Sequence, residues 1–148
     1  MSNVIHVSSG FVSSSMDGSV GNPYRTIQMA IDAARSGDTI LLAAGTYTGA
    51  GNRDFLVQGK SLSIVSEEGP EQTILDAERG GGLFSVVGDG ADGTTVRGIT
   101  FKNGYLRFGG DWDSKGLATV SGNARATVKD CVFTNNETQA TYVTSHTL

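Results

Sequence analysis

The sequence predicts an all-β fold: a short parallel β-helix, or solenoid, whose N-terminal end is capped by an α-helix. Two observations lead to this prediction. Only one convincing helical pattern occurs, near residue 30, and the chain beyond residue 50 repeats short strand-like runs with a period of roughly 30 residues. Parallel strands in an ordinary sheet need crossover helices, and no helical pattern follows residue 37. Each strand is therefore expected to pair with its own copy one turn later.

The length and composition of the chain indicate a single domain and argue against nucleic-acid binding. The 148 residues suit a single domain, with an N-terminal strand and capping helix in residues 1–37, turns in residues 38–136, and a last strand or tail in residues 137–148. The net charge is −4 and the 11 basic residues are scattered, so no basic face for nucleic acid is indicated. The 21 glycines beside two prolines indicate frequent tight turns.

The sequence also gives an expectation about the cellular location of the protein. The N-terminal stretch shows no basic region followed by an apolar run, so no signal peptide is predicted. No window approaches the roughly 20 apolar residues of a membrane span. We therefore expect a cytoplasmic location for the chain as it stands and no membrane partner. The single cysteine, Cys131, excludes an intramolecular disulfide.

One helix is predicted, from roughly Thr26 to Ser36. Its apolar residues follow the i, i+3, i+4, i+7 spacing of one helix face: Ile27, Ala30, Ile31 and Ala34. Thr26 is a suitable N-cap, and Gly37 follows the last turn as a C′ residue. The narrow stripe of small side chains must lie on an apolar surface, and the first turn of a solenoid is such a surface that needs a cap.

The strands are predicted from alternation and from the repeat. "DTILLAAGTY" predicts a buried strand with Ile40 and Leu42 on one face and Leu41 on the other. "FLVQG" and "FSVVG" align Phe55 with Phe84 in the following repeat. A second alignment, at one constant offset, matches Thr95, Val96, Arg97, Phe101 and Asn103 with Thr127, Val128, Lys129, Phe133 and Asn135.

Equivalent side chains of the repeats should stack on successive turns. Asn103 and Asn135 suit tight corners, because asparagine tolerates the left-handed backbone conformation. Cys131 aligns with Ile99, a core position, so it is expected to be a small buried hydrophobe rather than a nucleophile.

The N-terminal third resembles the cap of right-handed, single-stranded parallel β-helix proteins of the pectate-lyase and pectin-esterase type. The matching residues are Pro23, Tyr24, Thr26, Ile27, Gln28, Ala30, Ile31, Gly37, Asp38, Thr39, Ile40, Gly45 and Tyr47. The resemblance extends to about residue 136 and implies the right-handed fold. It also implies a family that is often secreted or displayed at the cell surface. Catalytic members carry their carboxylates several turns beyond the cap, and no corresponding motif is found here.

The segment 103–116, "NGYLRFGGDWDSKG", is an insertion relative to the other repeats. Aromatic rings beside charged groups suit sugar stacking and hydroxyl recognition, so the ligand-binding candidates are Tyr105, Phe108, Trp112 and Lys115. Asp111, Asp113 and Arg107 are the catalytic candidates, because paired carboxylates can act as acid and base. A loop that folds its aromatic side chains back onto the solenoid is the structural alternative.

Other polar residues carry weaker functional signals. Asp89 and Asp92 in "GDGADG" are candidate calcium ligands, although Asp-Gly is also an ordinary turn signal, so no cofactor is expected beyond this possible calcium. His6 and His146 have no evident partner and are expected on the surface. Asn136 begins an N-glycosylation sequon.

Two function classes remain open from the sequence. The first is a non-catalytic module, either carbohydrate-binding or structural, including a self-associating, adhesin-like solenoid. The second is a polysaccharide lyase or esterase, or a fragment of one, that acts on acidic polysaccharide at the insertion. Because no second helix is predicted to cap the last turn, a homodimer formed through the C-terminal ends is also expected.

Overall fold

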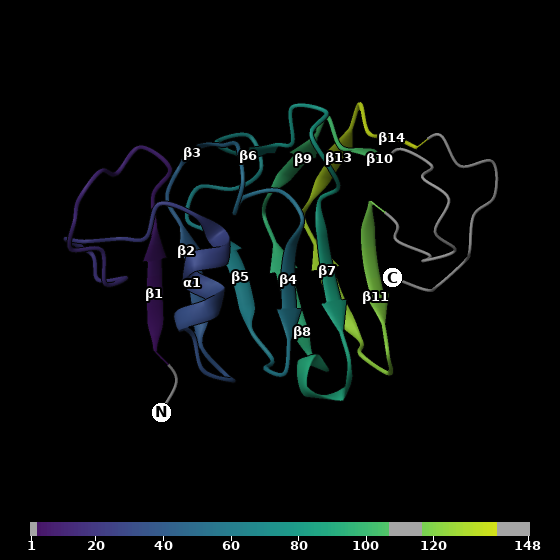
Figure 1. Ribbon diagram of the computed structural model, residues 1–148, viewed down its shortest axis with the longest axis horizontal. Coiled ribbons are helices and arrows are strands. Elements are labelled where there is room, and N and C mark those ends of the chain that lie inside the picture. Colours follow the sequence, from purple (N-terminus) through teal and green to yellow (C-terminus); the bar gives the residue numbers. More distant parts are fainter. Residues whose placement is uncertain (1–2, 107–116, 139–148) are drawn as a thin grey trace.

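The computed structural model describes residues 3–106 and 117–138. Over these residues the chain winds through short strands that make about four turns of a parallel β-solenoid, with one short α-helix near the N-terminus (Figure 1). The predicted all-β solenoid with an N-terminal helix is confirmed. Every strand pair between turns is parallel, so the strands form sheets that run along the axis of the solenoid.

Three sheets enclose the core. Sheet 1 contains, in spatial order, β1 (Val4–Val7), β2 (Thr39–Leu42), β5 (Ser63–Ser66), β8 (Thr94–Arg97) and β12 (Ala126–Lys129). Sheet 2 contains β3 (Gly45–Tyr47), β6 (Thr73–Asp76), β9 (Thr100–Lys102) and β13 (Val132–Thr134). Sheet 3 contains β4 (Phe55–Gln58), β7 (Phe84–Val87) and β11 (Ala118–Ser121).

A short strand pair and a 3₁₀ turn lie outside the three sheets. β10 (Tyr105–Leu106) and β14 (Glu137–Thr138) form a separate parallel pair after the strands of sheet 2. A 3₁₀ turn, η1 (Asp89–Ala91), joins β7 to β8. Each turn thus passes from sheet 1 to sheet 2 and then towards sheet 3.

The register agrees with the repeat in the sequence. Phe55 pairs with Phe84, and Phe101 pairs with Phe133. The residues of β12 pair one by one with those of β8, as the aligned repeats predict. Loops absorb the differences in turn length, so the strands stay aligned.

Stacked side chains fill the interior. The rings of four phenylalanines form a continuous row, with centroid separations of 5.4 Å, 5.2 Å and 5.2 Å: Phe55, Phe84, Phe101 and Phe133. The row crosses from sheet 3 to sheet 2, so it ties the two sheets together. Ile40 and Leu42 are fully buried while Leu41 is half-buried on the outer face, as predicted.

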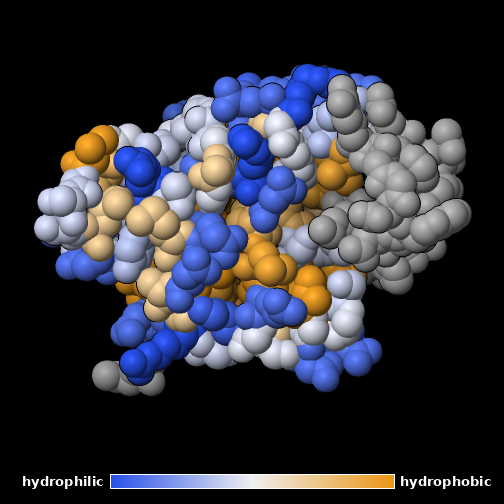
Figure 2. Space-filling view, viewed as in Figure 1, coloured by the Kyte–Doolittle hydropathy of each residue, from blue (hydrophilic) through white to orange (hydrophobic). Residues whose placement is uncertain are grey.

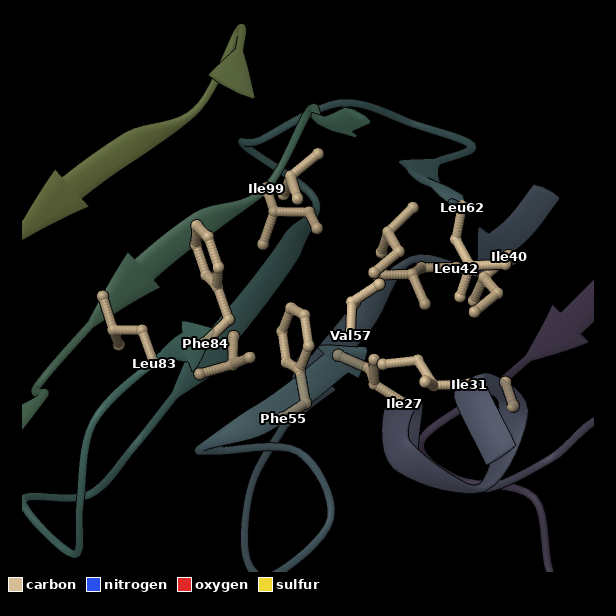
Figure 3. Close-up of a cluster of buried hydrophobic side chains, with 14 of the residues drawn as sticks. Ile27, Ile31, Ile40, Leu42, Phe55, Val57, Leu62, Leu83, Phe84 and Ile99 are labelled. Atoms are coloured by element: carbon tan, nitrogen blue, oxygen red, sulfur yellow. The ribbon is translucent and has the colours of Figure 1, made fainter. Parts of the chain in front are cut away.

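The helix α1 (Ile27–Ala33) covers the first turn. Figure 3 shows Ile27 and Ile31 pointing from the helix towards Val57 and Leu42. The Gln28 side chain takes the place of a neighbouring strand beside β4, because its Oε1 accepts from the Leu56 N–H at 2.8 Å and its Nε2 reaches the Leu56 carbonyl at 3.4 Å. The helix therefore covers the apolar end and also satisfies an edge of sheet 3.

The predicted end of this helix is wrong. Thr26 is the N-cap, as predicted, and its hydroxyl accepts from the Met29 N–H at 3.2 Å. The helix ends at Ala33, however, and Ala34 already has an extended backbone. Lys60 Nζ donates to the carbonyls of Ile31 and Ala34, each at 2.8 Å, and so satisfies the helix end from another turn.

The corners use left-handed backbone conformations where the sequence suggested them. Asn103 and Asn135 have φ of 59° and 55°. The Asn103 amide donates to Asp76 Oδ1 at 2.9 Å, one turn earlier. Asn136 accepts from the Gly104 N–H at 2.7 Å and donates to the Phe101 carbonyl at 3.1 Å. Asparagine side chains thus join successive turns.

The outer face of sheet 3 is partly apolar. Figure 2 shows hydrophobic residues over the middle of this face and hydrophilic residues along its upper and lower borders. Leu56 on β4 is 40% exposed. Among the described residues, no helix has the length and apolar character that crossing a bilayer would require.

Lys60→Met should destabilise the protein, because it removes the ammonium that caps α1 but keeps the aliphatic stem. We expect the free energy of unfolding to fall by about 1–2 kcal/mol. Chemical denaturation followed by circular dichroism measures this loss. The matched control is Lys102→Met, since Lys102 lies 4.0 Å from Asp76 and should contribute about 0.5 kcal/mol or less. Equal losses in the two variants would contradict the capping role.

Asp38→Asn should reduce the dependence of stability on acid. The N–H groups of Asn3 and Arg35 donate to the Asp38 carboxylate and lower its pKa in the folded protein. Its stabilising contribution is therefore present above the unfolded value of about 3.9 and is lost as the pH falls through the lower, folded pKa. Unfolding curves from pH 7 to pH 2 should show a lower stability at pH 7 and a shallower acid slope for the variant. Parallel curves would contradict this prediction.

Candidate functional site

The predicted ligand site falls mostly on the insertion. Of its residues the structure describes Tyr105, which lies in β10. The other candidates lie outside the described residues: Arg107, Phe108, Asp111, Trp112, Asp113 and Lys115. The site can therefore be examined at the corner from which the insertion starts, between sheet 2 and sheet 3.

At this corner Tyr105 is part of a compact group that we call the Arg79 cluster: Arg79, Tyr105 and Glu137. The Arg79 guanidinium lies over the Tyr105 ring, 4.4 Å from its centroid, a cation–π arrangement. Arg79 also pairs with the Glu137 carboxylate at 3.2 Å. Glu137 is held beside Tyr105 because the two residues face each other in the β10–β14 pair. The arginine and glutamate side chains are 53% and 58% exposed, so a ligand can reach both.

The backbone of the preceding turn positions the Arg79 cluster. Arg79 has φ of 57°, and its N–H donates to the Asn103 carbonyl at 2.8 Å. The Tyr105 N–H donates to the Gly81 carbonyl at 2.8 Å. A second guanidinium, that of Arg53, lies close to this loop, since a Cβ built on Gly80 would be 3.0 Å from Arg53 Cζ. Among the described residues Arg53 has no ion-pair partner.

The opposite corner, between sheet 1 and sheet 2, carries a groove that sequence reasoning missed. We call it the axial groove, because its lining comes from three successive turns. Its volume is about 640 Å³, and it is lined by Ser66, Glu67, Gly69, Pro70, Arg97, Gly98, Asp130, Cys131 and Val132. The groove arises because residues 67–72 form a long connection between β5 and β6, whereas residues 98–99 and 130–131 suffice for the next two turns.

The charges of the axial groove are of both signs. Arg97 is exposed and has no ion-pair partner among the described residues, although Glu67 and Asp130 line the groove on the turns before and after it. The available sequence signals were the acidic run at 67–71 and the repeat of Arg97 as Lys129. Neither signal indicated that Glu67, Arg97 and Asp130 would lie around one groove.

The two calcium candidates lie in one turn, where the Asp92 N–H donates to the Asp89 carbonyl at 3.1 Å. Asp92 forms an ion pair with Arg125, with separations of 3.1 Å to Nε and 3.0 Å to an Nη. The Arg125 side chain, followed by its backbone N–H, lowers the pKa of Asp92. Asp89 begins η1. A calcium ion at Asp92 would have to displace Arg125, and no group of three or more metal-ligating side chains gathers among the described residues.

The remaining candidates have defined environments where they are described. His6 is 23% exposed, and its Nδ1 lies 4.0 Å from Glu67 Oε1, so it has a potential ion-pair partner that the sequence did not reveal. His146 lies outside the described residues.

Cys131 lies one turn after Ile99 and packs against the core as a small hydrophobe, as predicted, but it is only partly buried. It is half-buried, because it belongs to the last described turn and lines the axial groove. Burial raises the pKa of its thiol. A raised pKa leaves the thiol protonated at neutral pH, which is unfavourable for a nucleophile.

The last described turn exposes part of the core. Phe133 is 44% exposed, whereas Phe101, its partner one turn earlier, is fully buried. β12 and β13 each pair with a strand on one side among the described residues. Of the predicted last strand or tail in residues 137–148, residues 139–148 lie outside the described part.

Comparison with known proteins identifies one matching family. A family model described as "Protein of unknown function (DUF1565)" matches residues 12–147. No curated protein matches the chain, and no solved structure matches it either. The resemblance to the pectate-lyase and pectin-esterase type therefore stays a prediction. Because the match spans nearly all of its residues, this chain belongs to the DUF1565 family of proteins of unknown function.

Proposed function

We propose that this chain is a non-catalytic β-helix module that binds polysaccharide at the Arg79 cluster, together with the insertion that starts beside it. The observation that carries the proposal is the exposed grouping of a ring, a guanidinium and a carboxylate at one corner. Sugars present hydroxyl groups that both donate and accept, and apolar ring faces that stack on aromatic side chains. The Arg79 cluster offers donors and acceptors, and the insertion adds Trp112 and Phe108.

In this proposal Tyr105 has a different role from the one the sequence suggested. Arg79 covers one face of its ring, so Tyr105 orients the guanidinium instead of offering that face to a sugar. Arg79 then donates to ligand hydroxyls, and Glu137 accepts from them. Stacking falls to Trp112 of the insertion.

Asp76, a carboxylate that adjoins the Arg79 cluster, is not tuned to act as a general acid. A general acid needs a raised pKa to hold its proton near neutral pH. Burial raises the pKa of Asp76, but hydrogen bonds from the Asn103 side chain and the Glu78 N–H, and the charge of Lys102, lower it overall. Asp76 adjoins the Arg79 cluster through Asn103, whose carbonyl accepts the Arg79 N–H. It is ionised at neutral pH and suits a structural or binding role.

A panel of neutral and acidic polysaccharides, titrated by calorimetry, tests the proposal. Trp112→Ala and Arg79→Ala should each weaken binding by about fivefold or more, because each removes roughly 1 kcal/mol of stacking or hydrogen bonding. Arg125→Ala is the matched control, since Arg125 is exposed and pairs with Asp92 away from the cluster. Absence of binding across the panel, or equal loss in the control, would contradict the proposal. New unsaturated or de-esterified ends that disappear in Asp111→Asn or Asp113→Asn would instead identify a lyase or esterase.

We also propose that two copies associate through the last described turn. The exposed side chain of Phe133 continues the interior row of phenylalanine rings, so a second copy would bury it. Light scattering should find a dimer, and Phe133→Lys should shift it to monomer. Val12→Lys is the control, because Val12 is 81% exposed in the N-terminal loop. A particle that stays monomeric at high protein concentration would rule the dimer out.

A further inference from the structure

We propose that the axial groove is a second binding site, specific for a neutral oligosaccharide laid along the solenoid axis. This site is separate from the Arg79 cluster, because the two lie at opposite corners of sheet 2. The proposal does not rest on the function proposed for that cluster.

The shape of the axial groove suits an extended ligand. Its lining comes mainly from the corners that follow β5, β8 and β12, which are successive strands of sheet 1. Adjacent strands in a sheet lie about 4.8 Å apart, so the lining repeats along the axis at that interval. A chain-like ligand that follows the axis therefore meets lining residues of each of the three turns in succession.

The walls of the groove are held in place before a ligand arrives. The long connection at 67–72 is anchored at two points, because the Gly69 N–H donates to Ser66 Oγ at 3.1 Å and the Thr100 hydroxyl donates to the Pro70 carbonyl at 2.6 Å. Gly98 has φ of 78°, and a Cβ there would clash with the Ser66 hydroxyl. A rigid site loses less conformational entropy when it binds.

The charges of the groove lining indicate the chemical class of its ligand. Glu67 and Asp130 place carboxylates on the turns that flank Arg97, so the three charged side chains of the lining sum to a net negative charge. This balance disfavours a polyanion, such as a polyuronate or a nucleic acid. A neutral saccharide suits both signs, because its hydroxyls donate to carboxylates and accept from a guanidinium.

The apolar part of the groove lining also suits a neutral saccharide. Pro70 and the 46%-exposed Val132 provide apolar surface between the charged groups. A sugar ring combines C–H surface with hydroxyls at its edge, so one ligand can satisfy both kinds of wall. Arg97 supplies the donors, since it has no competing ion-pair partner in the part of the chain that the structure describes.

Cys131 makes the proposal directly testable. It lines the groove and is the single cysteine of the sequence, so alkylation by iodoacetamide reports on this site alone. The reaction should be followed by mass spectrometry at about pH 9, because burial raises the pKa of the thiol and a measurable thiolate fraction is needed. The probes are three neutral hexasaccharides, cellohexaose, laminarihexaose and mannohexaose, and one anionic hexagalacturonate.

At least one neutral hexasaccharide should slow the alkylation of Cys131 about fivefold or more at saturation, while the hexagalacturonate should not. Arg97→Gln and Asp130→Asn should each raise the concentration needed for half-protection about fivefold or more. Both variants keep the fold, since both side chains are exposed and asparagine tolerates the φ of 53° at position 130. Circular dichroism checks this point.

The controls separate this site from the Arg79 cluster. Arg79→Ala and Trp112→Ala should leave the protection of Cys131 unchanged, whatever they do to polysaccharide binding elsewhere. The proposal is overturned if no neutral hexasaccharide slows alkylation, or if hexagalacturonate protects better. It is equally overturned if Arg97→Gln and Asp130→Asn leave protection intact, or if Arg79→Ala abolishes it.

Discussion

The structure depends on one constraint: each turn must place its inward side chains directly on those of the turn before. Strand side chains alternate between inside and outside, so a slip of one residue would turn a whole inward row towards solvent. The row of four phenylalanine rings shows how the constraint is met, with adjacent centroids 5.4 Å, 5.2 Å and 5.2 Å apart. Loops can vary in length because only the strands must match. Accordingly, a shorter stretch of sequence separates Phe55 from Phe84 than separates Phe101 from Phe133.

Because inward side chains stack from turn to turn, the first turn and the last described turn each have an apolar face with no further described turn beside it. The two faces are treated differently. At the N-terminal end a helix replaces a turn, and Gln28 supplies the hydrogen bonds that a neighbouring strand would have made to Leu56. Lys60 from the next turn then satisfies the end of that helix. At the last described turn, Phe133 remains 44% exposed. The core is therefore closed at one end by the apolar face of a helix whose polar groups have specific partners, and it presents apolar surface at the last described turn.

The two candidate sites both lie at corners of the solenoid, where connections of different length bring polar side chains together. The corner between sheets 2 and 3 gathers Arg79, Tyr105 and Glu137 around a cation–π contact and an ion pair. The corner between sheets 1 and 2 forms the axial groove, because one long connection stands beside two short ones. Both sites combine residues from different turns, so each turn contributes chemistry that none of them has alone.

The solenoid, the capping helix and the pairing of strands could be predicted from the amino-acid sequence. These features follow from local periodicity and from the repeat, as with Val96 and Val128. The end of the helix depends on the three-dimensional fold, because the capping Lys60 lies 29 residues after Ile31. The fold also determines which polar side chains meet. Arg79 and Glu137 are 58 residues apart, and Glu67, Arg97 and Asp130 come from three turns. Exposed charged residues carry no periodic signal, since their neighbours are set by loop lengths and stacking rather than by local sequence.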